Sequence, residues 1–382
     1  MVRSNAGVCL GLNEPWTVEE VELDPPGPHD VVVRMGFAGL CHSDEHLRVG
    51  DTTATPEYLE FLDVDSLFPV LGGHEGAGVV EEVGSLVTEL APGDHVATVF
   101  IPACGHCKWC ASGRQHLCDL GSRALAGPMI GDGVWRHRLG GRNLSRMFQV
   151  GTWTETLLID GRSLVKIPDD VPLDVAAVVS CGIATGFGSA VNRGNVRPGE
   201  VVVVVGTGGV GHGAVMGASL GGAHVIVAVD PLQQKREHAL GLGATHAADS
   251  MASALALVAE LTDGQMADMA ILTPGQLKGE MLAEALPLVS KGGRVVCTAV
   301  APSAALDAKI SLFDLNMSDK ALLGTLYGST SPRVQIANLL SLYRDGKLPL
   351  EKVISKRYQL DEINEGYKDM EEGRTVRGVI QF

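Results

Sequence analysis

The feature of this sequence that most restricts its fold is a run of five valines, Val201–Val205, followed at once by the glycine-rich GTGGVG. An apolar run without alternation is typical of a strand that is buried on both faces of a sheet. Gly206, Gly208 and Gly211 form G-x-G-x-x-G, in which the glycines allow a tight turn, the approach of a pyrophosphate, and close packing of helix on strand. The segment predicts a dinucleotide-binding turn. The alternative is a glycine-rich helix contact.

A second predicted strand, HVIVAVD, ends in Asp230, 19 residues after Gly211. An acid at that position accepts hydrogen bonds from the adenosine ribose and repels a 2′-phosphate, which favours NAD over NADP; the alternative is an ordinary helix-capping Asp. Strands such as DMAILT and GRVVCTAV then alternate with helical stretches, which predicts a parallel doubly wound sheet. Before about Ser180, short runs such as DVVVRMGFAG and DHVATVF are separated by PPGP and APGD. They predict a mostly antiparallel, irregular barrel-like domain.

Length and charge set further bounds. A chain of 382 residues is long enough for two domains. Its formal net charge of −15 argues against a nucleic-acid or anionic-membrane surface. Residues 201–229 contain no Asp, Glu, Lys or Arg, but their glycine spacing favours strand, turn, helix and strand over a membrane span. The first residues, MVRSNAGVCLGLNEPW, lack a sustained apolar region, so we expect a cytoplasmic, reducing location.

A cysteine cluster lies in IPACGHCKWCASGRQHLC, where the spacing is C-x2-C-x2-C-x7-C. Four thiolates at such short spacing complete a tetrahedral shell with no open position, which predicts a structural zinc. A disulfide pair, a redox thiol cluster and an iron–sulfur site are the alternatives, and two histidines of the same loop are competing ligands. The predicted ligands are Cys104, Cys107, Cys110 and Cys118.

A second set of metal-binding residue types is scattered along the chain. Residues 40–47 read LCHSDEHL, and His74 and Glu75 lie in LGGHEGAG, while Cys181 lies in VVSCGIATG. A catalytic zinc needs three protein ligands and an open position, and Cys2His is a known set. Taken singly, each of these residues is also compatible with an ordinary core position.

Taken together, these segments resemble the zinc-containing alcohol dehydrogenases of the medium-chain dehydrogenase/reductase family over nearly the whole chain. The matching segments are GLCHSDEH, GGHEGAGVVEEVG, the four-cysteine lobe, SCGIATGFGSA, VVVGTGGVG with Asp230, and VRGVIQF. The resemblance implies an α/β fold. It has a GroES-like irregular β-barrel catalytic domain over residues 1–182, with the zinc lobe at 101–120. A doubly wound Rossmann NAD-binding domain spans 183–326, and a C-terminal return to the catalytic domain spans 327–382.

The resemblance also implies an activity: a primary or secondary alcohol is oxidised to an aldehyde or ketone by hydride transfer to NAD. Two zinc ions per chain and a homodimer or homotetramer go with it. Cys41, His74 and Cys181 would bind the catalytic zinc, with Glu75 beside it and Asp44 supporting a ligand. Ser43 would pass the proton of the alcohol through the nicotinamide ribose to His46, and Phe100 would line the substrate pocket. The implied cofactor contacts are His42, Thr185, Gly206, Gly208, Gly209, Val210, Gly211, Asp230, Lys235 and Arg377.

Two departures from the familiar family pattern affect the cofactor. Residues 51–68 form an insertion, in which Thr55 and Pro56 predict the start of a short helix packed through Tyr58, Leu59, Phe61 and Leu62. We expect this insertion to lie over the cofactor or substrate entrance; the alternative is a surface decoration. His42 stands where some relatives have arginine, and a neutral histidine holds phosphate less strongly.

Finer details, including LYGSTSPR from Leu326, resemble the nicotinoprotein branch, the N,N-dimethyl-4-nitrosoaniline-dependent alcohol dehydrogenases. In that branch NAD stays bound and an external acceptor reoxidises it. The alternatives are an ordinary enzyme with dissociable NAD, a thiol-adduct formaldehyde dehydrogenase, and a non-catalytic binding protein on this fold. A binding protein has no need of a complete zinc and proton-relay set, which argues against the last.

Overall fold

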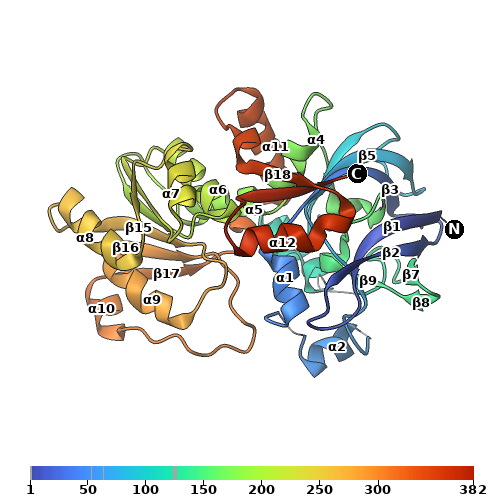
Figure 1. The fold of residues 1–382 in the computed structure, drawn as a ribbon, viewed down its shortest axis with the longest axis horizontal. Helices are drawn as coiled ribbons and strands as arrows, with labels where there is room; N and C mark the ends of the chain where they lie inside the picture. Colours follow the sequence, from blue (N-terminus) through green and yellow to red (C-terminus); the bar gives the residue numbers. More distant parts are fainter. Residues whose placement is uncertain (1, 53, 63, 124–126) are drawn as a thin grey trace. The chain divides into compact units, whose positions relative to one another are not determined.

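The computed structural model describes residues 2–52, 54–62, 64–123 and 127–382 (Figure 1). Contacts divide the chain into two compact units, of which the second is Gly182–Thr330 and the first combines the residues up to Cys181 with Ser331–Phe382. The sequence analysis predicted domain boundaries after residues 182 and 326. Residues 327–330 group with the second unit, where the side chain of Asn192 donates a hydrogen bond to the Gly328 carbonyl.

The second unit is built on a parallel sheet with the strand order β14-β13-β12-β15-β16-β17. In register, Val203 pairs with Val227 on one side and with Ala270 on the other, so β12 lies inside the sheet. The strands are β12 (Val201–Val205), β13 (Val225–Val229), β14 (His246–Ala248), β15 (Ala267–Leu272), β16 (Val289–Cys297) and β17 (Ala321–Gly324).

Helices cover both faces of this sheet. Val202 and Val204 pack in one core with residues of α6 (Gly209–Leu220) and α7 (Gln233–Leu240). Val203 and Val205 pack on the other face with residues of α8 (Met251–Leu261) and α9 (Gly279–Ala285). The valine run is therefore buried on both sides, and the predicted doubly wound sheet is confirmed. Other helical segments of this unit are α5 (Gly182–Gly188), η5 (Ser189–Arg193), η6 (Leu286–Leu288), α10 (Leu312–Met317) and η7 (Tyr327–Ser329).

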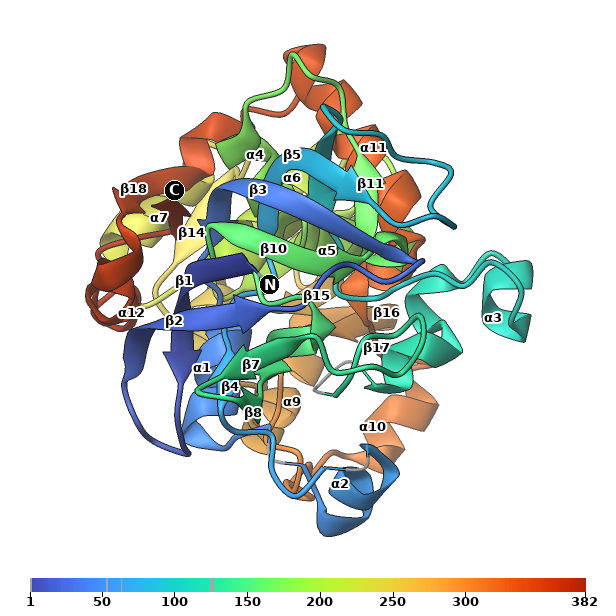
Figure 2. The ribbon, with the colours of Figure 1, turned by 90° about the vertical axis from the view of Figure 1, so that its right-hand side faces the viewer.

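The first unit contains two mostly antiparallel sheets (Figure 2). One has the order β8-β7-β2-β1-β4-β9 and the other β11-β6-β5-β3-β19-β18, with β10 also paired to β3. Register shifts in β3 against β5 bend the sheet, as expected for an irregular barrel. The strands from the N-terminal part are β1 (Val2–Cys9), β2 (Trp16–Leu23), β3 (Asp30–Gly39), β4 (Val70–Leu71), β5 (Gly76–Val83), β6 (His95–Thr98), β7 (His137–Leu139), β8 (Arg142–Asn143), β9 (Ser145–Arg146), β10 (Thr156–Asp160) and β11 (Leu164–Lys166).

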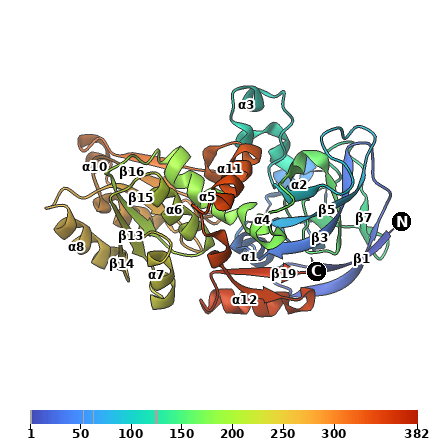
Figure 3. The ribbon, with the colours of Figure 1, turned by 90° about the horizontal axis from the view of Figure 1, so that it is seen from above.

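The end of the chain completes this first unit (Figure 3). Strand β19 (Arg377–Gln381) pairs antiparallel with β3, and β18 (Ile354–Tyr358) pairs with β19. One core joins residues from both parts of the chain, including Leu40, Trp153, Tyr358 and Tyr367. The C-terminal helical segments are α11 (Pro332–Arg344), η8 (Leu350–Val353), η9 (Leu360–Glu362) and α12 (Ile363–Glu371).

The insertion forms the expected short helix, α2 (Pro56–Leu62). The Tyr58 amide donates a hydrogen bond to the Thr55 hydroxyl, and Tyr58 and Leu59 pack against the core of the first unit. Phe61 differs from the prediction, because it is 53% exposed and contacts the Tyr58 ring instead of the core. Two residues of this insertion, Thr53 and Asp63, lie outside the described residues, and its expected position over the cofactor or substrate entrance stays a prediction. The other helical segments in the N-terminal part of the first unit are α1 (His42–Val49), α3 (Lys108–Ala111), η1 (Gln115–Leu117), η2 (Asp119–Arg123), η3 (Met147–Gln149), η4 (Gly161–Ser163) and α4 (Leu173–Val179).

The uncharged stretch 201–229 is strand, helix and strand, as the glycine spacing predicted. Within the part of the chain that the structure describes, no single helix is long and apolar enough to cross a membrane, although one bent pair of helices meets the length and composition criteria.

Candidate functional site

The four lobe cysteines form one thiol cluster around α3, in which all four sulfur atoms lie within 4.8 Å of one another. Backbone N–H groups of Cys104, Cys107 and Cys110 point at thiols of the same cluster, at 3.3–3.5 Å. Such amide donors favour thiolates, and the amide of Cys110 helps to lower the pKa of Cys107 to about 6.

The sulfur spacing fits a tetrahedral zinc. Bonds of about 2.3 Å from zinc to sulfur place neighbouring sulfurs about 3.8 Å apart, and the Sγ atoms of Cys104 and Cys110 are 3.9 Å apart. All eight cysteines of the chain are free thiols, so a disulfide in the lobe is excluded in this structure. His106 directs Nδ1 at the Cys104 carbonyl instead of at the thiols. The donor set therefore suits a structural metal.

The second cluster brings together residues that the sequence separates widely. One donor atom each from Cys41, His74, Glu75 and Cys181 lies within 4.8 Å of the others, and all four residues are buried. Cys41 is the N-cap of α1, and His74 and Glu75 immediately precede β5. Cys181 follows α4. The cluster therefore lies at the start of β5, at the start of α1 and just after the end of α4.

Hydrogen bonds fix the backbone around these donors. The Thr152 hydroxyl donates to the Glu75 carbonyl at 2.9 Å, and the Thr98 hydroxyl donates to the His74 carbonyl at 3.2 Å. From the C-terminal helix α12, the Tyr367 hydroxyl donates to the Cys41 carbonyl at 3.0 Å. The positions of three donors are therefore held by side chains from three other segments.

Asp44 lies behind His74. Its Oδ1 accepts from the Gly73 amide at 2.8 Å, and its Oδ2 lies 3.0 Å from Nδ1 of His74. The Nε2 atom of His74 is buried and has no hydrogen-bond partner among the described residues. A carboxylate on one ring nitrogen and an unpartnered second nitrogen facing thiols is the arrangement of a metal-binding histidine.

Electrostatics in the cluster favour thiolate. The pKa of Cys41 lies well below its usual range because the Cys181 side chain donates a hydrogen bond to it and the charge of His74 adds to the effect, against burial. Burial would lower the pKa of His74, but the negative groups of Asp44 and Cys41 raise it. The raised pKa favours a protonated His74. A metal ion that binds its imidazole must displace a proton, so metal binding releases protons.

The carboxylate of Glu75 is paired with a positively charged side chain. It is fully buried and forms an ion pair with Arg377, which is 4% exposed. A buried charge needs such a partner, because desolvation is costly. Arg377, expected at the cofactor pyrophosphate, is therefore paired with Glu75 in this structure.

The predicted relay residues share helix α1. Ser43 Oγ lies 3.6 Å from the Sγ of Cys41, which puts the hydroxyl beside the donor cluster. His46 is buried, and its Nδ1 lies 2.8 Å from Oδ2 of Asp51. The ring of His42 lies 6.1 Å from that of His46. Asp51 was missed by the sequence reasoning, and its five-residue separation from His46 gave no sign of the contact.

An aromatic wall adjoins the cluster. Phe100 contacts His74 edge-on with ring centroids 5.6 Å apart. Phe148, which the sequence reasoning also missed, stacks on Phe100 at 5.0 Å and meets His74 edge-on at 4.9 Å. Its backbone has φ 51°, a left-handed conformation that is rare for a bulky side chain. No sequence signal marked this position.

In the second unit the glycine-rich turn has the predicted geometry. Gly206 has φ +87°, and a Cβ there would lie 2.5 Å from the Thr273 carbonyl oxygen. A Cβ on Gly208 would meet open space, whereas one on Gly211 would lie 1.9 Å from the Gly206 oxygen. Gly209 and Val210 begin helix α6, so backbone N–H groups at a helix N-terminus are available to an anion.

Asp230 ends β13, and its carboxylate joins this turn to the start of α7. Its Oδ2 accepts from the Thr207 amide at 2.9 Å and its Oδ1 from the Leu232 amide at 3.0 Å. A carboxylate has about four lone-pair sites, so capacity for ribose hydroxyls remains. The neighbouring α7 carries Lys235, and the side chain of Arg236 donates to the Asp230 carbonyl at 2.7 Å.

Two histidines lie behind the turn, and the sequence reasoning did not use them. His212 is fully buried on α6; its Nδ1 lies 2.8 Å from the Gly208 carbonyl and its Nε2 lies 2.9 Å from Nδ1 of His238. Burial lowers the pKa of His212 to about 3. Thr185, expected near the nicotinamide, lies on α5, and its carbonyl accepts from the Ser189 hydroxyl.

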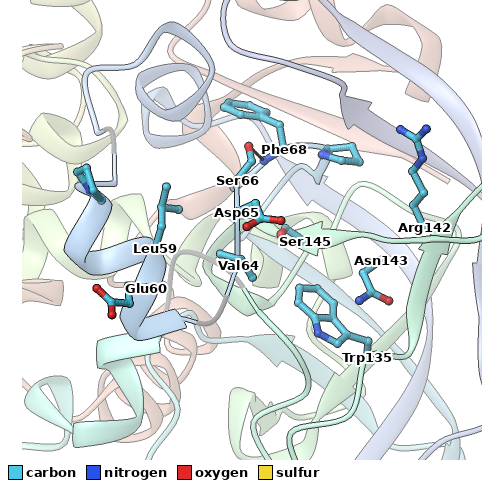
Figure 4. Close-up of a pocket in the computed structure, with 12 residues that line it drawn as sticks. Leu59, Glu60, Val64, Asp65, Ser66, Phe68, Trp135, Arg142, Asn143 and Ser145 are labelled. Atoms are coloured by element: carbon cyan, nitrogen blue, oxygen red, sulfur yellow. Dashed lines mark hydrogen bonds between the residues drawn. The ribbon is translucent and has the colours of Figure 1, made fainter.

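A separate pocket of about 850 Å³ lies in the first unit between α2 and the β7–β8 strands (Figure 4). Leu59 and Glu60 line it from α2, and Trp135 and Asn143 stand beside each other across from them. Its described lining residues include no thiol or histidine, so it is not part of either metal-binding cluster.

Known proteins resemble this chain over its full length. Two family models match: the alcohol dehydrogenase GroES-like domain over residues 27–169, and the zinc-binding dehydrogenase over residues 209–344. The chain is 44% identical over 379 residues to the NDMA-dependent alcohol dehydrogenase of Amycolatopsis methanolica, with 99% of each chain covered. It is 43% identical over 379 residues to the putative alcohol dehydrogenase D of Mycobacterium tuberculosis, with 99% of this chain and 100% of the relative covered. The crystal structure of benzyl alcohol dehydrogenase from Acinetobacter calcoaceticus has a TM-score of 0.88 at 28% identity, with 100% of both chains covered.

Proposed function

This chain belongs to the zinc-containing alcohol dehydrogenases, and from that premise we propose that Cys41, His74 and Cys181 hold its catalytic zinc. Glu75 stands beside the metal position, and the four lobe cysteines hold the second, structural zinc. The reaction is oxidation of an alcohol to an aldehyde or ketone. When bound, zinc supplies a Lewis acid that polarises the alcohol oxygen, and NAD supplies the hydride acceptor.

The observation that carries this proposal is the convergence of four buried donor atoms from three distant segments, all within 4.8 Å. A structural cluster would need no open position. Here the rings of Phe100 and Phe148 lie next to the donor cluster, so a substrate bound at the metal would contact an apolar surface. Such a surface beside the metal suits a catalytic site better than a purely structural one. The hydroxyl of Ser43, 3.6 Å from the Cys41 sulfur, is placed to take the proton of the alcohol, and His46 passes it on.

A direct test combines metal analysis with an alcohol assay. We expect two zinc ions per chain and oxidation of at least one alcohol from a panel of primary, secondary and aromatic compounds. Ser43→Ala should keep both metals and lose most of the activity, because only the proton step is removed. Cys297 lies outside both clusters, so Cys297→Ser is the control variant. It should keep both zinc ions and the activity. Protein that holds both zinc ions and NAD but oxidises no alcohol in the panel would refute the proposal.

For the substrate class, the aromatic wall favours an uncharged alcohol with an apolar or aromatic group. Phe100 and Phe148 stack 5.0 Å apart, and both rings contact His74 through their edges. Aromatic contacts favour a flat apolar group, whereas the negative face of an aromatic ring does not favour a carboxylate. Benzyl alcohol should therefore be oxidised with a higher kcat/KM than a hydroxy acid of similar size.

We also propose that NAD stays bound between turnovers and that an external acceptor reoxidises it. The 44% identity over the full chain to an NDMA-dependent enzyme supports this. His42, in place of arginine, opposes it, because a neutral imidazole attracts pyrophosphate less strongly.

Gel filtration followed by an absorbance scan tests cofactor retention. Protein that retains nicotinamide and reduces a nitroso acceptor with alcohol, without added NAD, supports retention. Protein that emerges free of nicotinamide and needs fresh NAD would place this chain with the ordinary NAD-exchanging enzymes.

Self-association is the remaining part of the proposal. The second unit exposes an apolar group around α10 next to the edge strand β17: Leu306 is fully exposed, and Leu312, Phe313 and Met317 are 65–78% exposed. Such a group is unfavourable in water and suits a homodimer or homotetramer contact. Sedimentation should give more than one chain, and Phe313→Asp should shift it toward the monomer. The thiols of both clusters need a reducing compartment, which supports a cytoplasmic location.

A further inference from the structure

The contact between His46 and Asp51 has no role in the reaction described so far. Helix α1 ends at Val49, and its C-cap Gly50 has φ +88°, so the chain turns back on the helix. The Thr52 amide donates to the His46 carbonyl at 3.2 Å, which holds the turn from its far side. The turn places Oδ2 of Asp51 2.8 Å from Nδ1 of His46.

This contact selects one tautomer of the histidine. A carboxylate can only accept a hydrogen bond, so Nδ1 of His46 must carry the hydrogen. In the neutral ring the lone pair then lies on Nε2. The His46 side chain is 8% exposed and the Asp51 side chain 28% exposed, so the carboxylate is the partner nearer to solvent.

Helix stabilisation does not explain the acid. Asp51 follows the C-terminus of α1, where the partial charge of the helix is negative and a carboxylate is unfavourable. Its contact with the imidazole is favourable, and that contact strengthens when the ring becomes positive. The geometry is therefore that of a carboxylate serving a proton-carrying histidine.

We propose that Asp51 is a positioning residue that holds His46 in its Nδ1–H form, so that Nε2 accepts the proton released by the alcohol. This rests on the proposed function, in which His46 carries that proton. The Nε2 lone pair forms the new N–H bond, the donating oxygen keeps its electron pair, and the imidazolium stays beside the Asp51 carboxylate. The imidazolium then releases the Nε2 proton to bulk water, so the neutral ring keeps its hydrogen on Nδ1, the tautomer that Asp51 selects. The first residue of the insertion thus serves the catalytic centre.

The test compares Asp51→Asn with Asp65→Asn, an exposed acid of the same insertion, in the zinc- and NAD-loaded protein. The asparagine amide can donate to Nδ1 as well as accept from it, so it no longer selects one tautomer. Nitrogen NMR of 15N-histidine protein, with His46 assigned through His46→Gln, should show a single Nδ1–H form in wild type and Asp65→Asn, and a mixture in Asp51→Asn.

Kinetics supply the second readout. The single-turnover rate of NAD reduction should fall about tenfold or more in Asp51→Asn, with KM and zinc content unchanged, and Asp51→Glu should recover part of the loss. Suppose that Asp51→Asn keeps a single Nδ1–H form and an unchanged rate, while His46→Gln is slow. That result would overturn the proposed role of Asp51 and leave the role of His46 intact. An unchanged rate in His46→Gln would instead remove the histidine from the proposed reaction.

Discussion

Mild acid should destabilise the nucleotide-binding unit through His212. This imidazole is fully buried, and burial lowers its pKa to about 3, against the usual 6.5 of an unfolded chain. Between those two values the unfolded state binds a proton that the native state excludes, so stability falls as pH falls from 6.5 toward 3. At pH 5, about 1.5 pH units below the unfolded pKa, the loss is about 2 kcal/mol at ~1.36 kcal/mol per unit.

His212→Asn isolates this effect. The asparagine amide can keep a donor near the Gly208 carbonyl but does not titrate, so the variant carries a penalty that is constant with pH. We expect wild type to lose about 2 kcal/mol more than the variant between pH 7 and pH 5.

Hydrogen exchange of peptides from β12 and α6 is the suitable assay, because it reports on this unit in a chain of two units. NAD content must be the same in all samples, since bound cofactor adds its own stabilisation. His137, a buried histidine of the first unit whose pKa is also lowered, is common to both proteins and cancels. Equal losses in wild type and variant would show that His212 does not exclude a proton in the native state.

Three further outcomes follow from the metal, cofactor and substrate sites. Cys104→Ser should lose one of two zinc ions with a lower unfolding temperature, whereas Cys41→Ser should lose the other zinc and the activity; metal analysis with calorimetry distinguishes them. Asp230→Ala should weaken NAD binding by about 1–3 kcal/mol and improve relative use of NADP, and an unchanged NAD to NADP preference would contradict this. Phe148→Ala should raise the KM for benzyl alcohol about tenfold with little change for ethanol, as steady-state kinetics on both alcohols would reveal.

Features encoded by local sequence could be predicted. The valine run needs apolar neighbours on both faces, and the glycine spacing allows only a tight turn, so strand, turn and helix follow from the residues alone. The four lobe cysteines lie within 15 positions and need little surrounding fold to meet. The same logic gave helix α2, whose N-terminal threonine and proline are local signals.

Features that depend on packing of distant segments could not be predicted. Phe148 contacts His74 from a left-handed backbone conformation, which no neighbouring residue type predicts. Asp51 reaches His46 through a turn whose direction is set by the Gly50 backbone. Phe61 was expected in the core because it is apolar, yet it is exposed and lies against the Tyr58 ring. Which side of α2 faces the core depends on how the helix packs, and composition does not give that.

The position of β19 sets the order in which the molecule can be completed. Residues 37–39 of β3 pair with β19, which is synthesised after the whole second unit, so this part of the strand edge waits for its partner, whereas β10 covers the rest of the edge earlier. The contiguous second unit has all of its residues much earlier, and so does the cysteine lobe. The Tyr367 hydroxyl that holds the Cys41 carbonyl also arrives late. The packing around Cys41 is therefore completed only after all residues of the second unit and of the cysteine lobe have been synthesised.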